Sequence, residues 1–246
     1  MRCTPILLML LLVGPAAADD SLIIAVASNF TRTASELAER FRADTGTEVL
    51  VSSGSTGTLY AHIVNGAPYD VFLAADSERP KLLEASGHAA PGTRFTYAQG
   101  ALALWSRKAP DCLGVLRDDD AGYVALANPL TAPYGAAAKE FLEGAGYWGA
   151  VSKRAVYGEN AMQALQFAAT GNATIVLVAR SLLTISSLPK ASCTWNVPTE
   201  AHAPILQQAV VVASTSNVDA ARRFADFLRS DAAREVIENH GYELPE

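Results

Sequence analysis

The feature that most constrains the fold is an alternation of short apolar segments with amphipathic helical segments, which begins at residue 22. LIIAVA (22–27) contains no polar residue, and apolar residues then recur at helical spacing from Ala34 to Phe41. EVLVSSG (48–54) and YDVFLAAD (69–76) repeat the apolar pattern, with a second helical segment between them. Continuous apolar strands are typical of a parallel sheet with helices on both faces. The sequence therefore predicts an α/β fold.

The rest of the chain continues the same alternation. Further strands are predicted in GALALWSR (100–107), GYVALANP (122–129), NATIVLVARS (172–181) and QAVVVAS (208–214). Helical spacing of apolar residues predicts helices that include 138–142, 162–169 and 221–228. With 246 residues, half of them hydrophobic, the chain can bury the core of one large domain or two small ones.

The first 18 residues have the pattern of a secretory signal peptide. Arg2 precedes the apolar run ILLMLLLVG (6–14), and three alanines (16–18) stand directly before Asp19. Such a run is too short to span a membrane. We expect cleavage ahead of Asp19 or Asp20. An uncleaved anchor is the weaker alternative, because no lipid-attachment cysteine stands at the junction.

Charge and hydropathy exclude two classes of protein for the chain after cleavage. Lys and Arg number 19 against 25 Asp and Glu, a net charge of −6 that becomes more negative when Arg2 is removed. This balance argues against a nucleic-acid partner, whose phosphates require basic patches. No later segment has eighteen uncharged apolar residues in a row, so we expect a soluble mature protein.

Two cysteines remain after the expected cleavage, Cys112 and Cys193. An even number in an exported chain predicts a disulfide, because the compartment is oxidising. Closing so long a loop would contribute about 4 kcal/mol to stability. Two buried free thiols are the alternative interpretation.

Four of the expected strand-to-helix turns share small, hydroxylated or amide residues. They are Ser28 with Asn29, SGSTG (53–57), PYG (133–135) and GEN (158–160). For any one turn, a plain helix cap explains these residues equally well. In doubly wound sheets, however, ligands collect outside the carboxyl ends of the strands, where such turns gather. Two turns come from each half of the chain, which predicts a cleft between two lobes.

The sequence lacks the motifs of an enzyme or a metal site. In SSGSTG (52–57) the two glycines are three apart, which fails the spacing of a nucleophile elbow, and no Gly-Lys-Ser/Thr of a phosphate loop follows. The four histidines are scattered and have no cysteine at metal spacing. Asp70 and Asp76 flank a strand, where carboxylates are more often caps or loop residues than an acid–base pair. We therefore predict no catalytic residue and no direct metal ligand.

Neutral hydrogen-bond donors at helix N-termini are what remains. Such donors suit a compact, fully ionised oxyanion, because N–H and O–H groups donate while each helix dipole adds roughly half a positive charge. No lysine or arginine is needed at such a site. Tyr134 is either a core aromatic or a phenol that donates to the anion.

At this point the chain resembles the periplasmic molybdate-binding proteins of ABC importers. The resemblance covers almost the whole chain after the signal segment, and the block from 52 to 76 is its most specific part. The segments that carry it are AVASNFT, SSGSTGTLYAHIVNGAPYDVFLAAD, LANPLTAPYGAAAKEFL, GENAMQAL and FADFLRSDAAREVIENHGYELP.

The resemblance implies a type II periplasmic-binding-protein fold of two α/β lobes joined by two crossover strands, each lobe a mainly parallel sheet covered by helices. The signal peptide would be 1–18, lobe one 19–98 with 206–246, and lobe two 99–205. Cys112 and Cys193 would then share a lobe. The family also implies a periplasmic protein without a cofactor that binds molybdate, and tungstate with it, and delivers it to an ABC permease. We expect a single copy, because solute shuttling favours one.

By the same resemblance, six residues would contact the anion in the cleft between the lobes. They are Ser28, Asn29, Ser55, Thr56, Tyr134 and Ala161, of which Ala161 can offer only its backbone N–H. Some members of the family carry a tyrosine where this chain has Ala179. Asn29 and Tyr134 follow the other pattern of the family.

Two rival hypotheses remain. The first is a binding protein of the same architecture for another solute, such as sulfate, phosphate or a small organic acid. An arginine clamp would favour a carboxylate ligand, but the four turns contain no Arg or Lys. The second is a secreted hydrolase with Ser55 as nucleophile and His62 as base, which requires the two side chains to meet.

Overall fold

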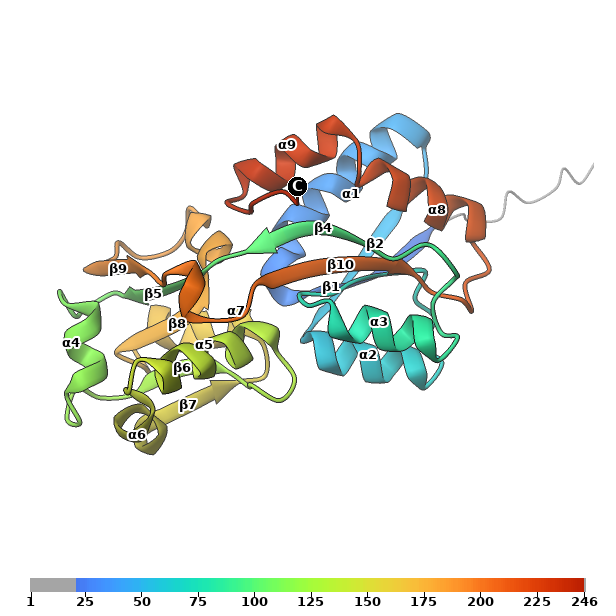
Figure 1. Cartoon of the computed structure of the whole chain (residues 1–246). Coiled ribbons are helices and arrows are strands. Elements are labelled where there is room, and N and C mark those ends of the chain that lie inside the picture. Colours follow the sequence, from blue (N-terminus) through green and yellow to red (C-terminus); the bar gives the residue numbers. More distant parts are fainter. Residues whose placement is uncertain (1–20, 246) are drawn as a thin grey trace, which may run out of the picture.

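The computed structural model describes residues 21–245. They form two α/β lobes, each built on a five-stranded sheet (Figure 1). No helix in this part of the chain combines the length and the apolar character needed to cross a membrane. The expected signal peptide, 1–18, lies outside the described residues.

The first sheet, which we call sheet one, is formed by strands from both ends of the chain. In spatial order its strands are β2 (Val49–Gly54), β1 (Leu22–Ala27), β3 (Val71–Leu73), β10 (Ile205–Val211) and β4 (Phe95–Gly100). The helices around it are α1 (Thr31–Thr45), α2 (Thr56–Val64), α3 (Glu78–Ala85), α8 (Val218–Phe227) and α9 (Asp231–Asn239).

The second sheet, sheet two, is formed by the middle of the chain. Its strands are β7 (Ala155–Gly158), β6 (Val124–Ala127), β8 (Ile175–Ala179), β5 (Leu102–Ser106) and β9 (Cys193–Asn196). Its helices are α4 (Cys112–Arg117), α5 (Pro133–Gly144), α6 (Trp148–Val151) and α7 (Ala161–Thr170). Short 3₁₀ helices are η1 (Ser28–Phe30), η2 (Ser152–Arg154), η3 (Arg180–Thr184) and η4 (Thr199–Ala201).

The two sheets have the same layout. In sheet one, β1 pairs in parallel with β2 and β3, and β10 then pairs antiparallel with β3 and β4. In sheet two, β6 pairs in parallel with β7 and β8, and β5 then pairs antiparallel with β8 and β9. Half of the strand pairs in each sheet are therefore parallel, and the four polar turns follow β1 and β2 in sheet one and β6 and β7 in sheet two.

Helices cover both faces of sheet one because neighbouring residues of its strands point to opposite sides. Ile24 belongs to a core with Phe41 of α1 and Phe224 of α8, whose rings meet edge to face at 5.2 Å. Ala25, the next residue, belongs to a separate core with Leu59 of α2. Figure 1 shows α1, α8 and α9 on one side of the sheet and α2 and α3 on the other. The continuous apolar strands are thus explained by burial on two sides.

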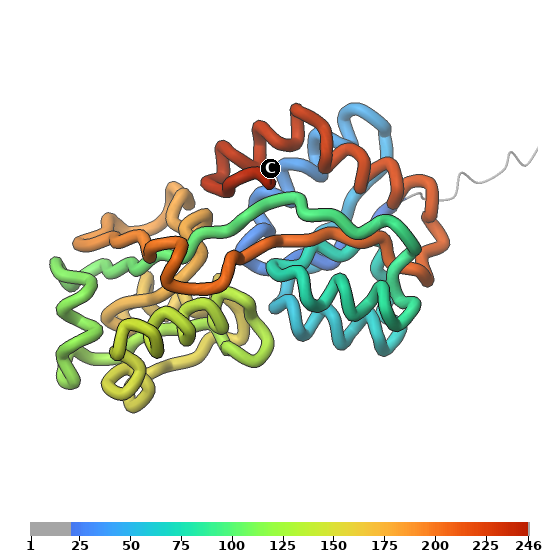
Figure 2. Tube along the Cα trace, viewed as in Figure 1, coloured from blue at the N-terminus to red at the C-terminus, as the bar shows by residue number. Residues whose placement is uncertain are grey.

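The chain passes between the lobes at two neighbouring places. It leaves sheet one at Gly100, enters sheet two at Leu102, and returns into β10 at Ile205. Figure 2 shows these two passages side by side, the green one from β4 and the orange one into β10, and Ile205 pairs with Gly100 at this point. Two adjacent connections of this kind form a natural hinge.

A disulfide joins Cys112, the first residue of α4, to Cys193, the first residue of β9. The predicted disulfide is therefore confirmed, and the alternative of two free thiols is not. It links residues 81 apart in the sequence within the lobe of sheet two. Because a crosslink of that span restricts the unfolded chain, the bond stabilises this lobe.

We expect the double variant Cys112→Ala/Cys193→Ala to lose about 2–5 kcal/mol of unfolding free energy, because the unfolded chain regains its loop entropy. Urea unfolding followed by circular dichroism measures this loss. Reductant should lower the stability of the unmodified protein to that of the variant and leave the variant unchanged. Equal unfolding midpoints for the two proteins without reductant would contradict the prediction.

Candidate functional site

The four polar turns meet at one small cavity between the lobes. All six residues proposed from the sequence line it: Ser28, Asn29, Ser55, Thr56, Tyr134 and Ala161. The space open to the centre of a water-sized sphere is about 10 Å³, the size at which a cavity holds roughly one water. The closed cavity therefore has no room for a sugar or an amino acid.

Equivalent positions in the two sheets supply the lining residues. Ser28 and Asn29 form the start of η1 after β1, the strand next to the edge, and Thr56 begins α2 after the edge strand β2. In sheet two, Tyr134 is the second residue of α5, after β6, the strand next to the edge, and Ala161 begins α7 after the edge strand β7. Four helix N-termini, whose first N–H groups have no partner inside the helix, therefore meet at one place.

Helix capping and the cavity use different N–H groups. Ser55 Oγ accepts the N–H of Thr58 at 3.3 Å, and Asn160 Oδ1 accepts the N–H of Gln163 at 3.0 Å. These caps occupy the third N–H of α2 and of α7. The first N–H of each helix belongs to Thr56 and Ala161, which line the cavity and have no partner within their own helices. The same turn can thus hold a helix cap and still have a free N–H group at the cavity.

The hydroxyl groups of Thr56 and Tyr134 are arranged to donate. Thr56 Oγ1 accepts the N–H of Ala75 at 3.1 Å, and the Tyr134 hydroxyl oxygen accepts Nε2–H of Gln207 at 3.3 Å. Neither hydroxyl proton has an acceptor among the described residues, so each proton can be given to a ligand. Burial raises the pKa of Tyr134 well above that of a free phenol. The phenol is therefore protonated, and a donor, at neutral pH.

Asn29 lines the cavity, but its side-chain amide is committed elsewhere. Its Nδ2 donates to Gln207 Oε1 at 2.9 Å and to the Tyr242 hydroxyl at 3.1 Å. Both amide hydrogens are used in these two bonds, so Asn29 can donate to a ligand only through its backbone. Ala179, at the end of β8, is fully buried and does not line the cavity.

No charged side chain lines the cavity. The nearest carboxylate along the chain, Asp76, contacts Arg79 Nη1 at 2.7 Å. Burial raises the pKa of Asp76, and the hydrogen bonds and charge of Arg79 oppose that rise. Asp70 instead accepts the N–H of Ile23 at 2.7 Å and bonds to the Thr215 hydroxyl. The two aspartates thus have separate structural partners and do not form an acid–base pair.

The described residues also offer no nucleophile or metal centre. The hydrogen bonds of Ser55 Oγ within residues 21–245 go to the N–H and hydroxyl of Thr58, and none joins it to His62, which is exposed. The same part of the chain contains no group of three or more His, Cys, Asp or Glu that could hold a metal ion. The arrangement can bind a small anion, but it does not activate Ser55.

Direct contacts hold the two lobes together around the cavity. The N–H of Gly57 in α2 donates to the carbonyl of Thr131, beside the start of α5, at 2.8 Å. Arg32 of α1 donates to the carbonyl of Thr184 at 2.9 Å, and Arg180 pairs with Glu243 at 3.2 Å. These contacts close the rim, which explains why the lining residues are almost inaccessible to solvent.

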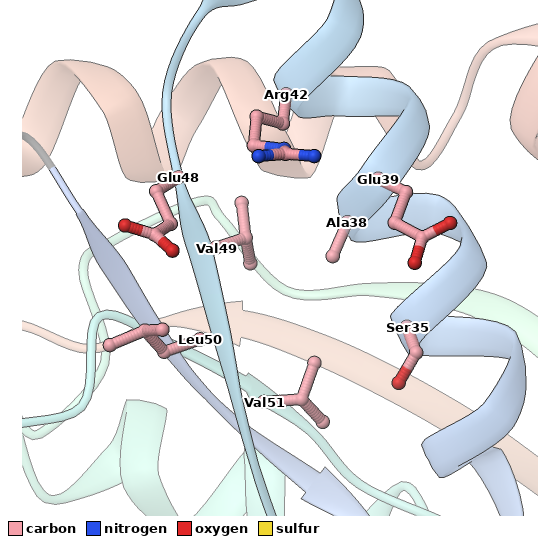
Figure 3. Close-up of a pocket in the computed structure, with 8 residues that line it drawn as sticks. All are labelled: Ser35, Ala38, Glu39, Arg42, Glu48, Val49, Leu50 and Val51. Carbon is pink, nitrogen blue, oxygen red and sulfur yellow. The ribbon is translucent and has the colours of Figure 1, made fainter.

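A larger hollow on the surface has a different character. It lies between α1 and the edge strand β2 (Figure 3), with a volume of about 340 Å³. Glu39, Arg42 and Glu48 surround it together with apolar residues of β2. No helix N-terminus points into it, because its helical residues come from the middle and end of α1. The small cavity between the lobes is therefore the candidate site.

Comparison with known proteins agrees with this assignment. Residues 22–243 match the family of bacterial extracellular solute-binding proteins. The chain belongs to this family. The match spans both sheets, so the residues that line the cavity all lie inside the segment that matches this family.

Individual solute-binding proteins are similar over nearly their whole length. The chain is 42% identical to the molybdate-binding protein ModA of Azotobacter vinelandii, over 95% of this chain and 94% of that protein. It is 40% identical to ModA of Rhodobacter capsulatus, over 97% of this chain and 94% of that protein. The solved structure of the A. vinelandii periplasmic molybdate-binding protein superposes with a TM-score of 0.85 at 38% identity, covering 92% of this chain and 100% of that one. The expected two-lobed fold is confirmed.

Two residues behind the cavity were not predicted from the sequence. Gln207 is fully buried in β10 and contacts both Asn29 and Tyr134. A Cβ atom at Gly100 would lie 2.0 Å from the Tyr134 hydroxyl oxygen, so this position has room only for glycine. The available signal for Gln207 was a polar pair, Gln207 and Gln208, inside an otherwise apolar strand.

We expect Gly100→Ala to destabilise the protein by about 1–3 kcal/mol, because the new methyl group must displace the buried phenol of Tyr134. Urea unfolding measures this effect. Gly144→Ala is the matched control, since a Cβ at Gly144 meets no atom within 4 Å, and it should cause no loss. If Gly100→Ala were as stable as the control, the close packing of Tyr134 on Gly100 would be refuted.

Proposed function

We propose that this protein captures molybdate, and tungstate with it, and delivers it to the membrane permease of an ABC importer. The observation that carries the proposal is the cavity itself, where four helix N-termini and four hydroxyl-bearing residues meet without a charged side chain. The relatives named molybdate-binding protein support the choice of anion. The resemblance to importer-binding proteins supports the permease as partner.

The donors match a fully ionised tetrahedral oxyanion. Ser28, Thr56, Tyr134 and Ala161 line the cavity, and the donors they would offer are the backbone N–H groups of Thr56 and Ala161 and the hydroxyl groups of Ser28, Thr56 and Tyr134. A hydrogen bond from such a donor to a charged acceptor is worth about 1.5–3 kcal/mol, so several of them together exceed the lower estimates of about 4 kcal/mol for association. The dianion would need no counter-charge from Lys or Arg.

Capture without catalysis follows from the same geometry. We propose that the anion docks on one lobe and that closure brings the donors of the other lobe onto it, which shifts the population to the closed form. The moving bodies would be 19–98 with 206–246 and 99–205. The protein would act in the periplasm as a single copy, as neither an enzyme nor the carrier of a cofactor.

Selectivity would come from the size of the closed cavity. Fixed donors that match a larger tetrahedron leave a smaller one, such as sulfate, with longer and weaker hydrogen bonds. Phosphate at neutral pH also carries a proton that needs an acceptor, and no carboxylate of residues 21–245 lines the cavity to take it. Both properties favour molybdate and tungstate.

Titration calorimetry with molybdate, tungstate, sulfate and phosphate tests this function. We expect dissociation constants in the micromolar range or tighter for the first two anions and no measurable heat for the last two. Native mass spectrometry of the protein soaked with each anion provides the control, since a bound tetraoxometallate adds a large and distinctive mass. Equal or stronger binding of sulfate or phosphate would overturn the proposal.

A further inference from the structure

Gln207 is a buried amide directly behind the cavity, and no role in binding follows for it from the sequence. It lies in β10, the strand that carries the chain back from sheet two, and it is completely inaccessible to solvent. A bulge between Gln207 and Gln208 interrupts the pairing of β10 with β4 at this point. A buried polar side chain must have its hydrogen bonds satisfied, so its partners indicate what it does.

The donors and acceptors around Gln207 can be assigned one after another, starting from a backbone carbonyl. The Tyr242 hydroxyl donates to the carbonyl of Asn29 at 2.7 Å, and a carbonyl can only accept. The Tyr242 oxygen is then free to accept from Asn29 Nδ2 at 3.1 Å, which fixes the orientation of the Asn29 amide. The other Nδ2 hydrogen of Asn29 donates to Gln207 Oε1 at 2.9 Å.

The same assignment of donors and acceptors extends through Gln207 to Tyr134. Gln207 Oε1 also lies 3.2 Å from the Tyr97 hydroxyl, which has the carbonyl of Ala74 as a second acceptor at 3.1 Å. With Oε1 accepting, Nε2 faces the Tyr134 hydroxyl oxygen at 3.3 Å and must donate to it. The Tyr134 proton cannot then point at Gln207. Because Tyr134 lines the cavity, that proton is available to a ligand there.

We propose that Gln207 is a positioning residue that turns the Tyr134 hydroxyl so that it donates into the cavity. This inference rests on the proposed function, since it assigns the origin of one donor to the bound oxyanion. The amide is suited to the task because it accepts at one end and donates at the other. A carboxylate of the same shape accepts at both ends and would take the Tyr134 proton for itself.

The test is a double-mutant cycle of Gln207→Glu and Tyr134→Phe, with the affinity for molybdate measured by calorimetry. We expect Tyr134→Phe alone to weaken binding about 10- to 100-fold, since it removes one hydrogen bond to a charged ligand. In the Gln207→Glu background, which binds weakly itself, Tyr134→Phe should change affinity less than about threefold, because the hydroxyl is already turned away. An equal penalty in both backgrounds would overturn the inference.

Gln208→Glu is the matched control, one residue along the same strand. Gln208 has its own partners, Arg94 and Thr96, and Arg94 would pair with a glutamate. The dissociation constant of this variant for molybdate should lie within about threefold of that of the unmodified protein. Adding Tyr134→Phe to it should weaken binding as much as Tyr134→Phe does alone. If the unmodified protein and Gln208→Glu do not bind molybdate or tungstate, the proposed function fails; if they bind but the cycle shows no coupling, only this inference fails.

Neutron diffraction keeps the inference testable if Gln207→Glu does not fold. Crystals of the unmodified protein with molybdate, exchanged into heavy water, would show the deuterium of the Tyr134 hydroxyl directly. We expect it on the side of the anion, with Gln207 Nε2 donating to the phenol oxygen. A deuterium pointing at Gln207 would overturn the inference.

Discussion

A dianion that is buried without a lysine or arginine must be held by hydrogen-bond donors and dipoles, and this requirement governs the region between the lobes. In this protein the donors are neutral, and two of the hydroxyl oxygens already accept a hydrogen bond from the protein. Thr56 Oγ1 accepts from Ala75, and the Tyr134 oxygen accepts from Gln207. Because these donors are already held in place, little free energy is lost in ordering them when an anion binds.

The fold delivers these donors because it contains the same arrangement twice. In each sheet the strand next to one edge has parallel neighbours on both sides, and the helices after this strand and after the edge strand begin at the cavity. Facing lobes then bring four such helix starts to one point, which a single sheet of this layout would not do. The hinge strands β4 and β10 contribute as well, since Gly100 makes room for Tyr134 and Gln207 orients it.

Periodicity predicted the buried strands and main helices because burial on two faces leaves long apolar runs such as LIIAVA. The half-exposed edge strand β9 (CTWN) and the proline-containing helix α3 lack such a signal. Strand direction in the antiparallel half depends on where the chain crosses between lobes, which no local pattern encodes. Turn chemistry and family resemblance predicted the residues that line the cavity. The commitment of the Asn29 amide to Gln207 joins residues 178 apart, so it becomes visible only in three dimensions.

The most direct measurement of the central claim is a crystal structure with molybdate, in which anomalous scattering locates the molybdenum. The account predicts one metal atom in the cavity between the lobes, with its oxygens within hydrogen-bond distance of the N–H groups of Thr56 and Ala161 and of the Tyr134 hydroxyl. No Lys or Arg side chain should touch the anion. Molybdenum at another place, or an arginine drawn into contact with it, would contradict the claim that uncharged donors alone hold the ligand.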